Sequence, residues 1–301
     1  YPNQQVIRQL LSDNELQPVL ERMKKGMPKH LWAITELDHS IRSSCYPKFQ
    51  LLFSLIYQID IAIAVGAVAR ERGWTYALAM PAEAAILEIN NCRHPALKEA
   101  KGNNCHFSVR QNLLFLTGAN MAGKSTYMKS IGATCYLAHM GFPVAADSMQ
   151  FSVKSGIFTS INVADNLNQG ISHFYAEVLR VKAVAASVCA QNNLLVIFDE
   201  LFKGTNVKDA YDATLAVTLS FGRFRNCHFI ISTHIIEAGE ELKQAGNHIR
   251  FGFMPTVLTA SGPRYTYKMQ EGISADRQGM MIIEKEGVLD QTVVIFATDH
   301  G

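Results

Sequence analysis

The sequence lacks the patterns that mark several classes of protein. None of its six cysteines forms a C-x-x-C pair and no H-E-x-x-H occurs, so a zinc site is unsupported. The amino terminus has no basic segment followed by an apolar one, as a secretory signal would have. Scattered cysteines fit a reducing cytosol, and we expect a cytoplasmic protein. The chain starts at Tyr1 rather than Met, and we expect it to be a piece of a longer protein.

Charge is sparse and balanced. Charged residues make up 18% of the 301, and 28 Lys and Arg against 26 Asp and Glu leave a net charge of +2. This balance creates no broad basic field, and it neither demands nor excludes a nucleic-acid partner. Apolar residues make up 48%, which is enough to bury a core.

One apolar stretch, residues 51–69, is almost long enough to span a bilayer. Gln58 and Asp60 lie near its middle, and a carboxylate there is costly in a membrane, at about 2.5–3.5 kcal/mol. We therefore interpret the stretch as a buried helix of a soluble protein, with no membrane partner.

The pattern of apolar residues differs between the two parts of the chain. Residues 1–88 show helical spacing of apolar residues, with a long helix over 49–72, and form a predicted helical segment. In residues 89–301 short apolar runs at 113–117, 194–198 and 229–233 precede helical patterns at 124–140, 208–222 and 235–246. Alternation of this kind predicts an α/β fold with a mostly parallel sheet covered by helices on both faces.

The segment GANMAGKST fits the pattern G-x-x-x-x-G-K-[ST] between a predicted strand and a predicted helix. Glycines let the backbone bend so that successive N–H groups face an anion, and the helix N-terminus adds a favourable dipole. Lys124 would reach the β and γ phosphates of ATP, and the Ser125 hydroxyl would bind Mg²⁺. The predicted phosphate-binding residues are Gly118, Ala119, Asn120, Met121, Ala122, Gly123, Lys124, Ser125 and Thr126.

Two acids end the apolar run 194–198. Ligands bind at the carboxyl ends of strands in open α/β sheets, so both acids are placed near the phosphate loop. Asp199 suits the magnesium shell, and Glu200 suits polarising the water that attacks ATP. The chain is thus predicted to be a Mg-dependent ATPase.

Two further residues are candidates on weaker grounds. His234 follows the run 229–233 directly and could sense the γ phosphate, with Lys124 and Glu200 as the other catalytic residues. Ser172 precedes a helical run, where it could cap the helix or present its hydroxyl to the phosphate of another subunit. Both interpretations of Ser172 stay open.

Taken in order, these motifs resemble the ATPase domain of MutS-type DNA mismatch-repair proteins, over roughly residues 50–290. The phosphate loop is close to that family's TGPNMGGKST, and Arg93-His94-Pro95 matches its element before the loop strand. The segments Ser172-His173-Phe174, 199–205 and Ser232-Thr233-His234 resemble its serine–threonine–phenylalanine, aspartate–glutamate and threonine–histidine segments.

The resemblance implies a P-loop NTPase fold of the ABC-ATPase-like kind, preceded by a core and lever segment. It implies that ATP lies between two protomers of a homodimer or of related subunits, with His94 beside the nucleotide and Ser172 acting in trans. ATP binding would tighten the dimer and hydrolysis would relax it, and so ATP would control a DNA clamp. DNA would be contacted by regions outside this chain.

The chain departs from the family at several positions. Ala119 and Ala122 replace a proline and a glycine, and His173 replaces a threonine. No segment resembles the mismatch-reading domain, so action on branched recombination DNA fits as well as mismatch repair. A transporter ATPase is disfavoured because the LSGGQ signature is missing. A dimerisation module that binds nucleotide without hydrolysing it is disfavoured by the intact Lys124, Asp199 and Glu200.

Overall fold

The computed structural model describes residues 2–26, 28–119, 121–161, 173–190, 193–246, 248–259 and 262–274. The chain divides into two compact units, residues 1–71 and 72–301. The sequence interpretation placed this boundary after residue 88. Residues 78–88 instead contain strand β1 (Leu78–Met80), the short 3-10 helix η1 (Ala82–Ala84) and the start of strand β2 (Leu87–Cys92), all of which belong to the second unit.

The first unit is helical, as predicted. Its helices are α1 (Pro2–Leu11), α2 (Leu16–Lys24), α3 (Leu31–Arg42) and α4 (Tyr46–Arg72). A small core forms where α2, α3 and α4 meet, around Leu16, Leu37 and Leu52. The ammonium of Lys48 on α4 lies 2.6 Å from Asp13 and 2.7 Å from Glu15, and so ties α4 to the turn before α2.

Helix α4 is less buried than the sequence suggested. By length and composition it could cross a membrane, and 11% of its most apolar window is buried. Apolar side chains such as Phe53, Tyr57 and Ile63 are exposed. The expectation of a buried helix is therefore wrong for this chain by itself. Gln58 and Asp60 are exposed as well, so the helix carries polar groups along the same exposed stretch.

The second unit is built on a six-stranded sheet with strand order β12-β9-β4-β8-β7-β6. Its strands are β4 (Leu113–Thr117), β6 (Gly156–Ser160), β7 (Leu194–Phe198), β8 (His228–Ser232), β9 (Ile249–Phe253) and β12 (Gln270–Glu271). All neighbouring pairs are parallel except β12 with β9. The predicted mixed α/β class is confirmed, and the three apolar runs seen in the sequence are the central strands β4, β7 and β8.

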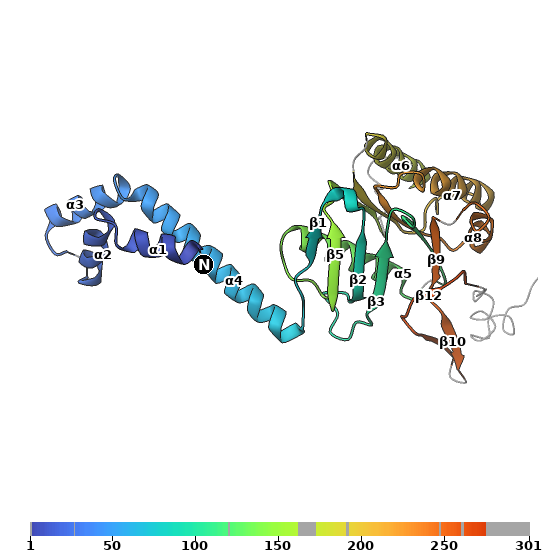
Figure 1. Ribbon diagram of the computed structural model, residues 1–301, viewed down its shortest axis with the longest axis horizontal. Helices are drawn as coiled ribbons and strands as arrows, with labels where there is room; N and C mark the ends of the chain where they lie inside the picture. The colour runs from blue at the N-terminus through green and yellow to red at the C-terminus, as the bar shows by residue number, and fades with distance from the viewer. Residues whose placement is uncertain are drawn as a thin grey trace, which may run out of the picture. The chain divides into compact units, whose positions relative to one another are not determined.

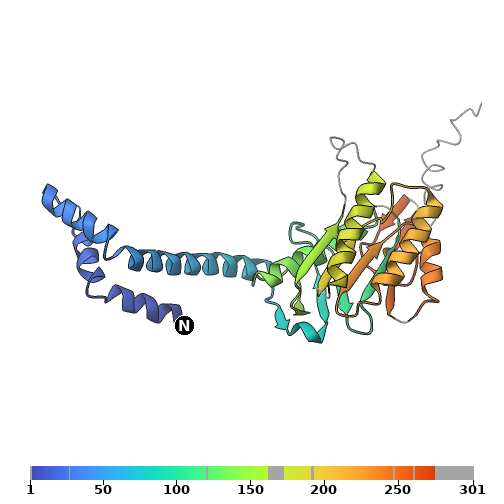
Figure 2. The same ribbon diagram turned by 90° about the horizontal axis from the view of Figure 1, so that it is seen from above.

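A second sheet with order β1-β5-β2-β3 adds β3 (Asn103–Phe107) and β5 (Ser148–Ser152) to β1 and β2. Helix α5 (Lys124–His139) packs with both sheets in one core, while α6 (His173–Cys189), α7 (Val207–Phe221) and α8 (Ile236–Leu242) lie together on the other face of the larger sheet (Figures 1 and 2). Strands β10 (Thr256–Thr259) and β11 (Gly262–Tyr265) form a separate hairpin.

The central strands are apolar on both faces because both faces are covered. Along β4, Leu114 and Leu116 contact the α5 core, whereas Leu113 and Phe115 contact the core under α6, α7 and α8. Strand β7 divides in the same way. Continuous burial explains why these strands show no polar alternation in the sequence, and it makes the sheet a rigid support for the loops at its edge.

Lys154 is a buried charge that lies just before β6, at the end of the larger sheet where β6, β7 and β8 begin. It is 8% exposed, and its ammonium donates to Asn193 Oδ1 at 2.6 Å and to the Asn226 carbonyl at 3.2 Å. In the described part of the chain no carboxylate pairs with it. Burial lowers the pKa of Lys154 to about 8.

We expect this lysine to make stability rise with pH. Between about pH 8 and its ordinary pKa of 10.5, the unfolded chain holds a proton that the folded chain releases. Between pH 7.5 and pH 10 the free energy of unfolding of the wild type should therefore gain about 2.5 kcal/mol relative to that of Lys154→Met. Chemical denaturation at pH 7.5 and 10 measures the difference. Lys129→Met, at an exposed position of α5, is the control. If the stability of Lys154→Met changed with pH as that of the wild type does, Lys154 would not have a lowered pKa.

Candidate functional site

Three loops meet at one edge of the six-stranded sheet because three neighbouring parallel strands end there. Strand β4 leads into the glycine-rich loop, β7 leads into Asp199 and Glu200, and β8 leads through Ser232 to His234. Strand β8 lies between the other two and pairs with both. The motifs are distant in sequence, and the parallel order brings them together.

The glycine-rich loop needs its two glycines. Gly118 has φ +125° and Gly123 has φ +108°, values that side chains rarely adopt. A Cβ on Gly118 would also lie 3.1 Å from the Met254 carbonyl oxygen. Ala122 is fully buried and is absent from the positive-φ positions, so an alanine fits where related loops have glycine. Ala119 is half-buried, Met121 is exposed, and Asn120 lies outside the described residues.

Lys124 begins helix α5, and its side chain is 3% exposed. Its ammonium donates to the Gly118 carbonyl at 2.6 Å and to the Ala119 carbonyl at 3.1 Å, so it lies inside the curve of the loop. Burial lowers the pKa of Lys124, and the charges of Glu200 and Asp199 act in the opposite direction. The ammonium of Lys124 is therefore held against the backbone of the glycine-rich loop.

The next residue, Ser125, contacts the first acid. Its hydroxyl donates to Asp199 Oδ2 at 2.5 Å, and the hydroxyl of Ser232 donates to Asp199 Oδ1 at 2.6 Å. A hydroxyl and a carboxylate side by side at a helix N-terminus are hard oxygen ligands of the kind that Mg²⁺ takes from proteins. The predicted pair Ser125 and Asp199 is therefore brought together.

Glu200 follows Asp199 with φ +52°, in the left-handed region. Its backbone N–H donates to Ser232 Oγ at 3.2 Å, and its carboxylate lies 3.0 Å from the ammonium of Lys203. This ion pair raises the pKa of Lys203. The side chain of Glu200 is 18% exposed, so the carboxylate keeps access to solvent at the site edge.

Fewer contacts define the positions of the remaining predicted site residues. His234 is exposed just beyond β8 and makes no hydrogen bond among the described residues. Thr126 is exposed on the first turn of α5, and its carbonyl accepts from the Ser130 hydroxyl at 2.7 Å. Ser172 lies outside the described residues, so neither of its two interpretations is tested.

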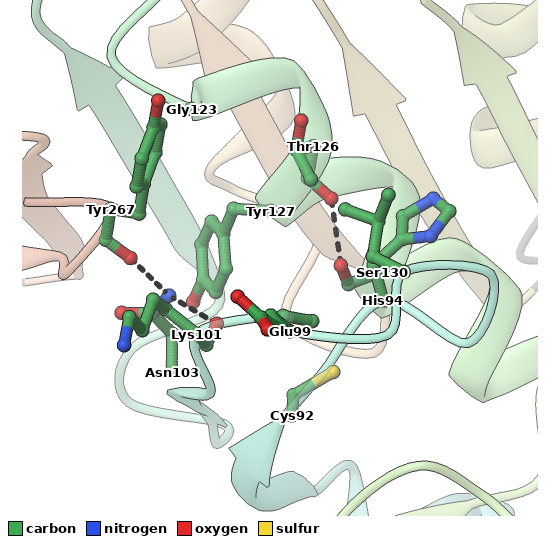
Figure 3. A pocket seen from close by; sticks show the side chains of 12 residues that line it. Cys92, His94, Glu99, Lys101, Asn103, Gly123, Thr126, Tyr127, Ser130 and Tyr267 are labelled. Carbon is green, nitrogen blue, oxygen red and sulfur yellow. Dashed lines mark hydrogen bonds between the residues drawn. The ribbon is translucent and has the colours of Figure 1, made fainter. Parts of the chain in front are cut away.

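A pocket of about 440 Å³ opens beside the loop (Figure 3). Gly123 and Thr126 form its loop side, and His94, Lys101 and Tyr267 also line it. The Tyr267 ring lies against Gly123, where a Cβ would be 3.0 Å from Tyr267 Cδ1. His94 Nδ1 accepts from the Ala96 N–H at 3.3 Å, which orients the imidazole.

Asn103 holds the far wall of this pocket together. Its amide nitrogen donates to the Tyr267 carbonyl at 2.9 Å, and its amide oxygen accepts from the Met269 N–H at 2.8 Å. Strand β3 is thereby joined to the segment that carries Tyr267 (Figure 3). A flat aromatic ring, an imidazole and a lysine around an opening next to the loop suit the nucleoside part of a nucleotide.

The sequence profile of MutS domain V matches residues 114–300. The chain belongs to the MutS family. The matched region begins in β4 and includes the glycine-rich loop, both acids and His234, so the site lies within MutS domain V except for the pocket wall formed by residues 92–103.

Two curated relatives carry the name "DNA mismatch repair protein MutS". The protein of Geobacillus sp. (strain WCH70) is 27% identical over 272 residues, which cover 88% of this chain and 31% of the relative. The protein of Geobacillus thermodenitrificans (strain NG80-2) is 31% identical over 197 residues, covering 64% of this chain and 21% of the relative. The chain therefore spans less than a third of the length of these MutS proteins.

Sequence reasoning missed three residues of this MutS site. Tyr267 and Asn103 line the pocket but lie in no recognisable motif, and Ser232 was noted as part of a Ser-Thr-His segment without a role. A polar residue directly after the apolar run Phe229, Ile230 and Ile231 was the available signal for Ser232, since His234 had already marked that strand end as part of the ligand edge.

Proposed function

We propose that this chain is the ATP-binding and ATP-hydrolysing dimerisation module of a MutS-type DNA mismatch-repair protein. The observation that carries the proposal is the meeting of Lys124, Ser125 and Asp199 beside a glycine-bent loop, with Glu200 at the same strand end. The family supports it, and the names of both relatives favour mismatch repair over action on branched DNA.

The residues present fit a magnesium nucleotide. Backbone N–H groups of residues 118–125 and the N-terminus of α5 would receive the phosphates of ATP or ADP, and Lys124 would turn from the loop carbonyls to the β and γ oxygens. Ser125 and Asp199 would hold Mg²⁺, which neutralises phosphate charge when bound. The nucleoside would enter the pocket between His94 and Tyr267.

Glu200 is the group that we assign to the attacking water. Its carboxylate would accept a hydrogen bond from the water and orient it toward the γ phosphorus, while Lys124 stabilises the charge that develops on the phosphoryl oxygens. His234 would sense the γ phosphate from the neighbouring strand end. Ser172 would complete the site of a partner protomer, so that ATP favours the closed dimer.

The proposed coupling of ATP to DNA rests on membership of the MutS family. ATP-driven closure would be passed to a DNA clamp through the helical first unit, with DNA bound by regions outside this chain and the protein in the cytoplasm.

Lys124→Ala tests nucleotide binding. Loss of a charged donor to phosphate is expected to weaken the affinity for Mg·ATP by about tenfold or more. Isothermal titration calorimetry on the 301-residue chain measures this, and Lys129→Ala, an exposed lysine on the same helix, should bind as the wild type does. Equal affinities in wild type and Lys124→Ala, or no binding by the wild type, would refute the proposal.

A further inference from the structure

The hydroxyl of Ser232 is used twice at this site. It donates to Asp199 Oδ1 at 2.6 Å and accepts from the Glu200 N–H at 3.2 Å. The other carboxylate oxygen of Asp199 accepts from Ser125 at 2.5 Å. Both oxygens of Asp199 are thus held by serines from different elements, one on α5 and one on β8.

Ser232 has this position because of the strand order. It is the last residue of β8, the strand that separates β4 from β7, and it is fully buried. The three residues before it, Phe229, Ile230 and Ile231, are fully buried and apolar. A hydroxyl buried here costs free energy unless it is paired. The Ser232 hydroxyl donates to the Asp199 carboxylate and accepts from the Glu200 backbone N–H. Packing alone therefore does not account for a serine at this position.

The bond to the Glu200 N–H stabilises an unfavourable backbone. A non-glycine residue in the left-handed region costs on the order of 1–3 kcal/mol, and Glu200 has φ +52°. The Ser232 hydroxyl gives this peptide group a partner, and at the same time fixes the rotation of the neighbouring carboxylate.

We propose that Ser232 is a positioning residue that couples the orientation of the metal-binding carboxylate of Asp199 to the backbone of Glu200. The inference rests on the proposed function, since it assigns Ser232 to the same nucleotide site. When Mg²⁺ takes the Ser125 hydroxyl as a ligand, the bond from Ser232 is the one that would still hold the Asp199 carboxylate in place. Ser232 would therefore act on magnesium affinity without touching nucleotide or metal.

The test separates magnesium binding from nucleotide binding. Affinities of wild type and Ser232→Ala for ATP are measured by calorimetry in EDTA and over a series of Mg²⁺ concentrations. Substitution of a residue that orients a metal ligand typically lowers metal affinity by 10- to 100-fold. Mg²⁺ is expected to raise the affinity for ATP, and the Mg²⁺ concentration that gives half of this gain should be about tenfold higher for Ser232→Ala than for the wild type. The affinity for ATP in EDTA should be the same for both proteins.

Ser152→Ala is the matched control, because Ser152 is also fully buried in a strand and its hydroxyl accepts from the Ile86 N–H at 3.0 Å, in the smaller sheet. It should bind ATP as the wild type does at every Mg²⁺ concentration. An unchanged magnesium requirement in Ser232→Ala, or an equal loss of affinity with and without Mg²⁺, would overturn the role of Ser232 and leave the proposed function standing. A wild type that binds no nucleotide would overturn both.

Discussion

Replacing Glu200 by glutamine is expected to lower ATP turnover by at least about a hundredfold, while the affinity for Mg·ATP stays within about threefold of the wild type. General-base groups typically contribute 10²- to 10⁴-fold to a rate. Glutamine keeps the size of the side chain and the backbone bond to Ser232, but it cannot accept the proton of the attacking water. Phosphate release measured at saturating ATP, alongside calorimetric binding, gives both quantities.

The structure offers a closely matched control for this variant. Glu200 pairs with Lys203 at 3.0 Å, and Glu240 on α8 pairs with Lys243 at 3.1 Å, in the same i,i+3 spacing. Glu240→Gln removes an equivalent charge and ion pair away from the site, and its turnover should equal that of the wild type. Turnover by Glu200→Gln within threefold of wild type would exclude Glu200 as the base.

The same measurement decides between an ATPase and a module that only binds nucleotide. A wild type that binds Mg·ATP but releases no phosphate, alone or with duplex DNA, would leave the dimerisation role and remove the catalytic one.

Acid is expected to destabilise the second unit through His228, on the order of 4 kcal/mol. His228 lies in β8, is fully buried, and stacks on Phe107 with ring centroids 5.1 Å apart. Its Nε2–H donates to the Ala85 carbonyl at 3.0 Å. Burial, together with the positive charge of Lys154, lowers the pKa of His228 from 6.5 to about 3.

The pKa values of His228 in the unfolded and folded chain determine whether acid raises or lowers stability. Between about pH 6.5 and pH 3 the unfolded chain binds a proton that the folded chain does not, so stability is complete above pH 6.5 and is lost as the pH falls. His228→Phe keeps the ring stacking but cannot titrate. It should be less stable at pH 7, by about 1–3 kcal/mol, because the Ala85 carbonyl loses its donor.

The difference between the two proteins should change with pH. From pH 7 to pH 4 the wild type should lose about 3 kcal/mol more than His228→Phe, as measured by urea denaturation. His30→Phe, at an exposed position of the first unit, serves as the control. A constant difference between wild type and His228→Phe over this range would show that His228 is not held neutral by burial.

Several elements could be predicted closely. The runs 113–117 and 194–198 are the strands β4 and β7 as predicted, and α5 and α7 differ from the helices predicted after them by one residue at their ends. The run 229–233 corresponds to β8 at 228–232, and the helix predicted over 235–246 is the shorter α8, which stops at Leu242. These segments were predictable because burial on both faces demands continuous apolar residues and because glycine and lysine spacing is local. The unit boundary predicted after residue 88 lies instead at residues 71–72, because the short strand β1 and the 3-10 helix η1 carry too little periodicity to be recognised.

Groups whose geometry is local could be recognised from the amino-acid sequence: the loop with glycines at 118 and 123, the lysine and serine that begin helix α5, and two acids at the end of a buried strand. Backbone conformation and strand burial leave these marks on neighbouring residues. Contacts between strands, and between segments that are far apart in the sequence, could be seen only in the folded chain. The placing of β8 between β4 and β7 puts Ser232 on both acids, the bonds of Asn103 bring Tyr267 to the pocket, and the packing of the first unit leaves α4 exposed. Such contacts depend on which strands become neighbours, and a single sequence carries no local mark of that choice.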